Sequence, residues 1–152
     1  MANWFECKVK FEKLSEQDGS RAIASEIYLV DAINFTNAEE RVISEALPMA
    51  QGEVNVDSIK HVKIVEIIPH EGEENYWFKC KVNYIIVDEE KGEEKRTSQA
   101  WLVQADNFRQ AVDYLYAEIE KSNADIEVVQ VNQTNILDVL FYAPKETVAN
   151  NQ

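Results

Sequence analysis

The six residues Trp4-Phe5-Glu6-Cys7-Lys8-Val9 recur 73 residues later as Trp77-Phe78-Lys79-Cys80-Lys81-Val82. The same offset places Gly19 on Gly92 and Asn34 on Asn107, and residues 4–45 give 15 identities in 42 aligned pairs. One deleted residue then aligns residues 64–68 with 136–140. Self-similarity at a fixed offset is typical of a repeated structural unit. The sequence therefore predicts a tandem duplication, with copies at about residues 4–69 and 77–141.

The hydrophobic pattern predicts the same ββαβ unit in each copy. The first strand of each copy alternates apolar and polar residues, as a half-buried strand does. Glycine supplies the positive φ of the hairpin that follows, at Gly19 and Gly92. The second strands are expected at residues 23–32 and 96–105, and the third strands at about residues 58–68 and 126–140. The last of these is longer than a typical strand, so a bend within it stays open.

A helix is expected after the second strand of each copy. Apolar residues there follow the spacing of a helix with one buried face, including Tyr116 in the second copy. Asn34 and Asn107 precede these helices, and an asparagine oxygen can accept from the free amides of a first turn. We expect the following residues to be buried: Phe5, Cys7, Val9, Leu29, Phe35, Ala38, Phe78, Cys80, Val82, Leu102, Phe108 and Ala111.

The expected fold class is α+β, a two-layer domain of helices on an antiparallel sheet. Three strands and one helix bury too little surface alone, so the two copies should pack about an approximate twofold axis as a single domain over residues 1–142. The short connector at residues 69–74 favours adjacent halves. Residues 143–152 are expected to be a flexible tail.

The charge balance narrows the classes of partner. The chain has 28 acidic and 15 basic residues, a formal net charge of -13. Such a field repels phosphate backbones and anionic lipids, which disfavours double-stranded nucleic acid and membranes and favours a protein partner with basic surface. No leader or membrane-spanning stretch is recognisable, and two isolated cysteines suit a reducing compartment. We therefore expect a cytoplasmic protein, for which a homo-oligomer stays open.

Catalytic, metal-binding and cofactor signatures are not recognisable in the sequence. Cys7 and Cys80 lie on the apolar strand faces, where a thiol acts as a small hydrophobe. His61 and His70 do not occupy equivalent positions in the two copies. We expect no catalytic residue, no metal site and no cofactor.

One surface stands out as a candidate binding site, the mixed face of the two first strands. Aromatic rings and lysines on an open sheet face can stack bases and hold phosphates of single-stranded nucleic acid. A solvated lysine face with tryptophans covering a core edge is the plainer interpretation. The candidate residues are Trp4, Lys8, Lys10, Trp77, Lys79 and Lys81.

The chain resembles an uncharacterised domain family of Bacteroidetes and their phages. The resemblance rests on Trp4-Phe5-x-Cys7-Lys8-Val9, Tyr28-Leu29-Val30-Asp31-Ala32, Asn34-Phe35-Thr36-x-Ala38-Glu39 and Ile64-x-Glu66-Ile67. It implies a bacterial or phage cytosolic setting and brings no activity or site residue.

These observations favour a small non-enzymatic protein that binds or regulates another macromolecule. Two other functions stay open. The first is a small-molecule site or an active site in a pocket between the two copies. The second is binding of single-stranded nucleic acid by the tryptophan and lysine face.

Overall fold

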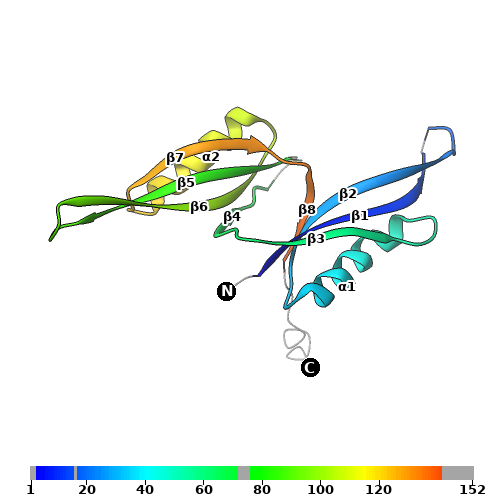
Figure 1. Ribbon diagram of the computed structural model, residues 1–152. Helices are drawn as coiled ribbons and strands as arrows, with labels where there is room; N and C mark the ends of the chain where they lie inside the picture. Colours follow the sequence, from blue (N-terminus) through cyan, green and yellow to red (C-terminus); the bar gives the residue numbers. More distant parts are fainter. Residues whose placement is uncertain (1–2, 16, 72–75, 142–152) are drawn as a thin grey trace, which may run out of the picture. The chain divides into compact units, whose positions relative to one another are not determined.

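A computed structural model describes residues 3–15, 17–71 and 76–141 of the chain. Its residues form two compact units (Figure 1). Unit 1 contains the residues up to Val62 and those from Asp138 onward, and unit 2 is Lys63–Leu137. Each unit has a four-stranded sheet and a helix. The predicted α+β class is confirmed, whereas the packing of both copies into a single domain about a twofold axis stays a prediction.

Unit 1 is built on a sheet with the strand order β3-β1-β2-β8. Its elements are β1 (Trp4–Leu14), β2 (Arg21–Asp31), α1 (Phe35–Ala46), the short 3-10 helix η1 (Leu47–Met49), β3 (Asn55–Val62) and β8 (Ile136–Leu140). The β1–β2 hairpin turns at Gly19, whose φ of 70° favours glycine. The α-helix ends one residue before η1, which contains Pro48.

Unit 2 is built on a sheet with the strand order β4-β6-β5-β7. Its elements are β4 (Glu66–Ile68), β5 (Tyr76–Asp88), β6 (Glu93–Ala105), α2 (Phe108–Lys121) and β7 (Ile126–Gln133). The β5–β6 hairpin turns at Gly92 with a φ of 64°. This hairpin continues past the end of β7 as a two-stranded ribbon (Figure 1).

Where the sequence predicts a single third strand in each copy, the structure has two strands. The two strands belong to different sheets. The first, expected at residues 58–68, is β3 in unit 1 followed by β4, which lies beside β6. The second, expected at residues 126–140, is β7 followed by β8, which lies beside β2. The prediction of one strand was therefore wrong at residues 58–68, and residues 126–140, where the length suggested a bend, are two separate strands as well. Local alternation of apolar residues cannot reveal such a break, because it indicates a buried face and not a neighbouring strand.

The sheet of unit 2 is mixed, not antiparallel as expected. β5 pairs antiparallel with β6 and β7, but β4 pairs parallel with β6 through Ile67 opposite Leu102. Parallel pairing follows from the chain path, because β4 joins this sheet from β3 and not through a hairpin.

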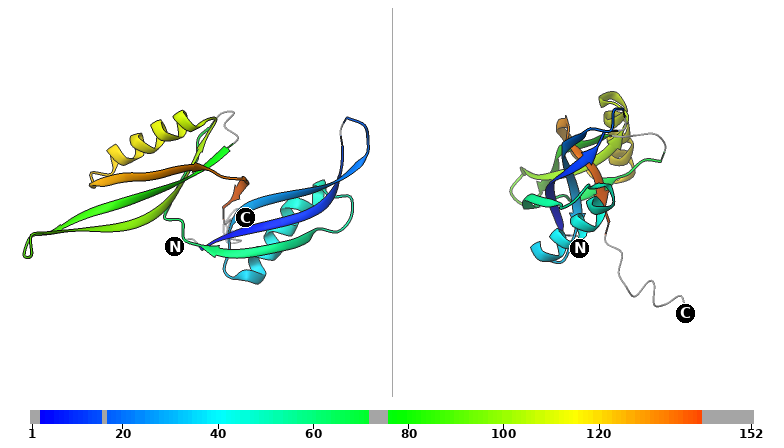
Figure 2. Two further views of the ribbon diagram at one scale, coloured as in Figure 1. Left: turned by 45° about the horizontal axis from the view of Figure 1, so that its top comes forward. Right: turned by 90° about the vertical axis from the view of Figure 1, so that its right-hand side faces the viewer.

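Each helix covers one face of its own sheet (Figure 2). In unit 1 the apolar face of β1 and β2 packs against Ala38, Val42 and Ala46 of α1. In unit 2 the corresponding faces of β5 and β6 pack against Ala111 and Leu115 of α2. Small side chains on the helices bring each helix close to its sheet.

The predicted core is largely confirmed, with three corrections. Phe35 and Phe108 are 53% and 57% exposed, because each is the first residue of its helix and only the ring edge reaches the core. Their ring centroids lie 5.0 Å from Phe5 and 6.5 Å from Phe78. Tyr116 is also exposed, and Tyr114 packs against the core in its place.

The predicted asparagine caps are confirmed at both helices. Asn34 Oδ1 accepts from Asn37 N at 2.8 Å, and Asn107 Oδ1 accepts from Gln110 N at 2.9 Å. The residue that donates to each cap also returns a hydrogen bond through its side chain. Asn37 Oδ1 accepts from Ile33 N, and Gln110 Oε1 accepts from the amide of residue 106. Each cap oxygen satisfies an amide that the helix itself leaves free, and the returning bond satisfies the amide of the residue before the cap.

Among the described residues, no helix has the length and apolar character needed to cross a membrane. The connector and tail predictions concern residues 69–74 and 143–152. Residues 72–75 and 142–152 lie outside the described part of the chain.

Candidate functional site

The face of the unit 2 sheet that points away from α2 contains a small group of lysines. Phe78, Cys80 and Val82 of β5 pack toward α2, so the alternating residues Lys79 and Lys81 lie on the opposite face. On β7, Asn132 is opposite Lys79 and Gln130 is opposite Lys81. Two cationic side chains on the central strand are thus bordered by two amides.

Two residues of β6 that lie beside Lys81 have small side chains. Ala100 is opposite Lys81, and Ser98 is the next residue of β6 on the same face. These small side chains leave a groove of about 380 Å³. We call it the lysine groove; it is lined by Lys63, Lys79, Lys81, Ser98, Gln99, Ala100, Gln130 and Asn132.

The three lysines of the groove have no carboxylate within ion-pair distance in the described part of the chain. All three are exposed. A local cluster of three positive charges, with amide and hydroxyl groups beside it, can hold an anionic group by charge-assisted hydrogen bonds.

A hydrogen-bonded network lies on the same face of the sheet, between the groove and the β5–β6 hairpin turn. Glu127 Oε1 accepts from Asn83 Nδ2 at 3.0 Å and from Arg96 Nε at 2.9 Å. These two bonds lower the pKa of the Glu127 carboxyl, with the Asn83 bond as the larger cause. The Glu127 carboxyl is therefore ionised and pairs with Arg96. It does not form an ion pair with the lysines of the groove.

The candidate tryptophans do not belong to an open face. Trp4 and Trp77 are only 5% and 3% exposed, so neither ring can stack on a base. In unit 1 the ring of Phe141 meets Trp4 edge-on, with centroids 5.6 Å apart. The candidate open aromatic face is therefore absent at these positions, and the burial agrees with the plainer interpretation, in which the tryptophans cover a core edge. Alternation places a residue on a face but does not show what covers that face.

The lysines of unit 1 form a different surface. Lys8 is half-buried, and Lys10 lies 3.7 Å from Asp57 in an exposed ion pair. Glu6 stands at the position equivalent to Lys79, and Ile27 at the position equivalent to Ala100. Unit 1 therefore lacks the lysine equivalent to Lys79 and the small side chain equivalent to Ala100.

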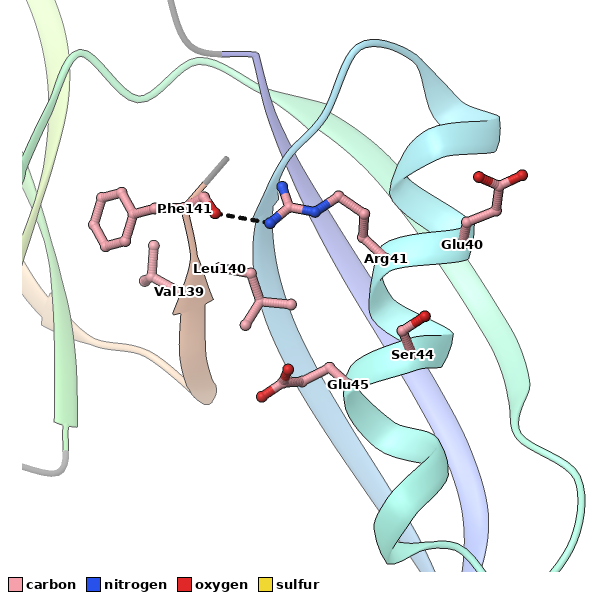
Figure 3. Close-up of a pocket in the computed structure, with 7 residues that line it drawn as sticks. All are labelled: Glu40, Arg41, Ser44, Glu45, Val139, Leu140 and Phe141. Atoms are coloured by element: carbon pink, nitrogen blue, oxygen red, sulfur yellow. Dashed lines mark hydrogen bonds between the residues drawn. The ribbon is translucent and has the colours of Figure 1, made fainter. Parts of the chain in front are cut away.

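A larger groove of about 600 Å³ lies between α1 and β8 in unit 1 (Figure 3). Glu40, Arg41, Ser44 and Glu45 line it from the helix, and residues 139–141 line it from the strand. Arg41 crosses the groove and donates to the carbonyl oxygens of Asp31 and Phe141. Its guanidinium thus ties the ends of β2 and β8, so we assign this groove a structural role.

The cysteines and histidines do not add a reactive centre. Burial raises the pKa of Cys7 to about 11 and that of Cys80 to about 12, so both are neutral thiols at physiological pH. His61 lies beside the Phe5 ring, and His70 stacks on Tyr114 with centroids 3.5 Å apart. Within residues 3–15, 17–71 and 76–141, no group of three or more His, Cys, Asp or Glu residues could hold a metal ion.

Sequence reasoning found two residues of the groove, Lys79 and Lys81, and missed the others. Lys63 was overlooked because it lies in what seemed to be a continuous strand. Gln130 and Asn132 carry a usable signal, since they alternate with the apolar residues Val129 and Val131 along β7.

Comparison with known families gives a match over nearly the whole chain. The family described as Domain of unknown function (DUF4494) matches residues 3–142. No curated protein matches the chain.

Proposed function

We propose that this chain, which belongs to the family described as Domain of unknown function (DUF4494), is a non-enzymatic binding protein. Its lysine groove holds an anionic group of the partner. The observation that carries this proposal is the set of three exposed lysines without a carboxylate neighbour in the described part of an acidic chain.

The chemistry of the groove supports recognition of a carboxylate or phosphate. Lysine ammonium groups donate to oxygen anions, and the side chains of Ser98, Gln130 and Asn132 supply neutral hydrogen bonds beside them. Neutral cysteines and separate histidines provide no activated nucleophile or base near the groove. Binding without chemistry is the simplest use of such a surface.

Single-stranded nucleic acid is the second function considered for this face. Its sequence-tolerant recognition depends on stacking of bases on exposed aromatic rings. The burial of Trp4 and Trp77 removes these rings and leaves only phosphate contacts. The net charge of -13 opposes a long polyanion, so a short anionic group is favoured.

Titration of the full chain with citrate and with inorganic pyrophosphate, followed by amide NMR, tests the proposal. We expect saturable shifts at Lys79, Lys81 and Ser98, weakened by added salt because the attraction is electrostatic. The variant Lys79→Gln/Lys81→Gln should lose the shifts. Lys8→Gln is the matched control, since Lys8 is equivalent to Lys81 in unit 1, and it should bind like the parent.

Two results would count against an anion-binding groove. One is the absence of saturable shifts with either anion at low salt. The other is equal binding by the Lys79→Gln/Lys81→Gln variant and the parent, which would place the anion elsewhere.

The setting and the remaining surface belong to the same proposal. The resemblance supports a cytoplasmic protein of Bacteroidetes or their phages. The acidic balance supports a protein partner with basic surface that faces the rest of the molecule. Formation of a homo-oligomer is compatible with both.

We further propose that the two units descend from one duplicated ββαβ repeat. Three observations support this: the 15 identities between residues 4–45 and 77–118, the equal order of strands and helices, and the same capping bonds at Asn34 and Asn107. Buried aromatic residues agree as well. Tyr28 Oη donates to Glu26 and Trp101 Nε1 donates to Gln99, each two residues back along its strand.

A further inference from the structure

The edge of β6 next to the lysine groove has unused backbone hydrogen-bonding groups. β4 pairs with residues 101–103 of β6, and the Val65 amide donates to the Ala100 carbonyl oxygen at 2.9 Å. Beyond Ala100, no strand in the described part of unit 2 covers this side of β6. Backbone groups alternate sides along a strand, so those of Ser98 and Arg96 point to the same open edge as those of Ala100.

We propose that an extended, acidic segment of a protein partner adds to this open edge in line with β4. The inference rests on the proposed function, because the groove lysines would hold the carboxylates of that segment. Strand addition takes its affinity from main-chain hydrogen bonds and its specificity from alternate side chains.

The side chains between the lysines and the edge support this arrangement. Adjacent strands lie about 4.8 Å apart, so an added strand would be about 10 Å from β5. Ala100 is the β6 residue opposite Lys81, and it is too small to block the path from Lys81 to the edge. Lys79 is opposite Leu102, where β4 already pairs with β6, so Lys79 lies beside the end of the open stretch. Extended lysine and glutamate side chains together span about 10 Å, which lets Lys81 reach over β6.

Positive charge at this edge favours an acidic segment. Lys63 precedes β4 and lines the end of the groove where the added strand would begin. Lys81 is opposite Ala100, the first residue of the open stretch, and Lys79 is two residues further along β5, opposite Leu102. The three positive charges of the groove therefore lie where the open stretch of the edge begins.

The equivalent place in unit 1 is filled. Ile27 replaces Ala100 there, and Glu6 replaces Lys79. The substitution Ala100→Ile therefore inserts a side chain that the other copy already carries in its second strand. It should fold normally while filling the groove, which makes it a sharper test than removal of charge alone.

The test uses the full chain and a fluorescein-labelled nine-residue peptide that alternates glutamate and threonine. Fluorescence anisotropy measures binding, and amide hydrogen exchange reports pairing at Ser98 and Arg96. We expect saturable binding, slower exchange at both amides, and an affinity at least tenfold lower for Ala100→Ile and for Lys79→Gln/Lys81→Gln. Lys8→Gln should bind like the parent.

Three control probes separate the outcomes. The same peptide with glutamine in place of glutamate tests the charge, and a peptide N-methylated at alternate residues tests the backbone pairing. A nine-nucleotide oligothymidine tests nucleic acid. Both altered peptides should bind at least tenfold more weakly than the parent peptide, and the oligonucleotide should not compete with it.

Several results would overturn the inference. Peptide binding without protection of Ser98 and Arg96 excludes strand addition, and binding of oligothymidine in place of the peptide excludes a protein segment. Citrate or pyrophosphate binding without peptide binding refutes this inference alone and leaves the anion-binding function intact. Absence of all three kinds of binding refutes both proposals.

Discussion

Replacement of the capping asparagines tests how each helix is held at its start. Asn34→Ala and Asn107→Ala remove an oxygen that accepts from the third residue of the helix, at 2.8 and 2.9 Å. Both caps are exposed, so water replaces part of the lost bond. The expected cost is therefore about 1 kcal/mol per cap, the ordinary value for such a change.

The shift in the melting temperature follows from the size of the body that unfolds. The entropy of unfolding is about 2.1 cal/mol/K per residue. Unit 2 runs from Lys63 to Leu137, so with about 75 residues a loss of 1 kcal/mol lowers its midpoint by about 6 °C. If all 152 residues unfold as one cooperative body, the same loss lowers the midpoint by only about 3 °C.

Thermal melts followed by circular dichroism, together with guanidinium titrations, measure both quantities. Asn34→Asp and Asn107→Asp are the matched controls, because aspartate keeps the acceptor and adds a charge that favours a helix N-terminus by about 0.3–1 kcal/mol. Unchanged melting midpoints in both alanine variants would refute the stabilising role of the caps. A shift with alanine and an equal shift with aspartate would point to loss of the asparagine amide group instead.

The remaining predictions concern the two cores. Leu115→Ala should lower the free energy of unfolding by about 2–5 kcal/mol, because Leu115 is fully buried between α2 and its sheet. Leu137 is half-exposed, so Leu137→Ala should change this free energy by less than about 0.5 kcal/mol. Guanidinium denaturation of both variants measures the difference. Native Cys7 and Cys80 should resist iodoacetamide at pH 8 and react after unfolding, and rapid labelling of the native chain would contradict their burial. Since burial raises both pKa values, the stability from neutral thiols is complete below about pH 9 and is lost as pH rises toward about 11 for Cys7 and about 12 for Cys80, which denaturation series at increasing pH measure.

Much of the local structure could be predicted from the sequence because its signals are short in range. A glycine with positive φ belongs to a short turn, as at Gly19 and Gly92, whose amides donate to carbonyl oxygens only four residues back. An asparagine cap acts over three residues, as at Asn34 and Asn107. The α+β class and the position of both helices follow from such signals together with hydrophobic periodicity.

The sequence revealed only part of the candidate site, because its signals are short in range. Alternation along β5 placed Lys79 and Lys81 on the face opposite the core. The amides of Gln130 and Asn132 join them only because β7 pairs with β5 in one particular register. The burial of Trp77 depends on what covers the face, which alternation within one strand does not report.

The sequence by itself determined the α+β class, the two hairpins, the two helices and most of the residues on each apolar face. Only the tertiary structure decided that β4 lies beside β6 and β8 beside β2, and that the edge of β6 next to the lysines stays open. Strand neighbours are chosen by backbone hydrogen bonds, and every residue except proline offers the same donor and acceptor. Side-chain patterns therefore predict which face of a strand is buried, whereas the partner of its edge depends on the path of the whole chain.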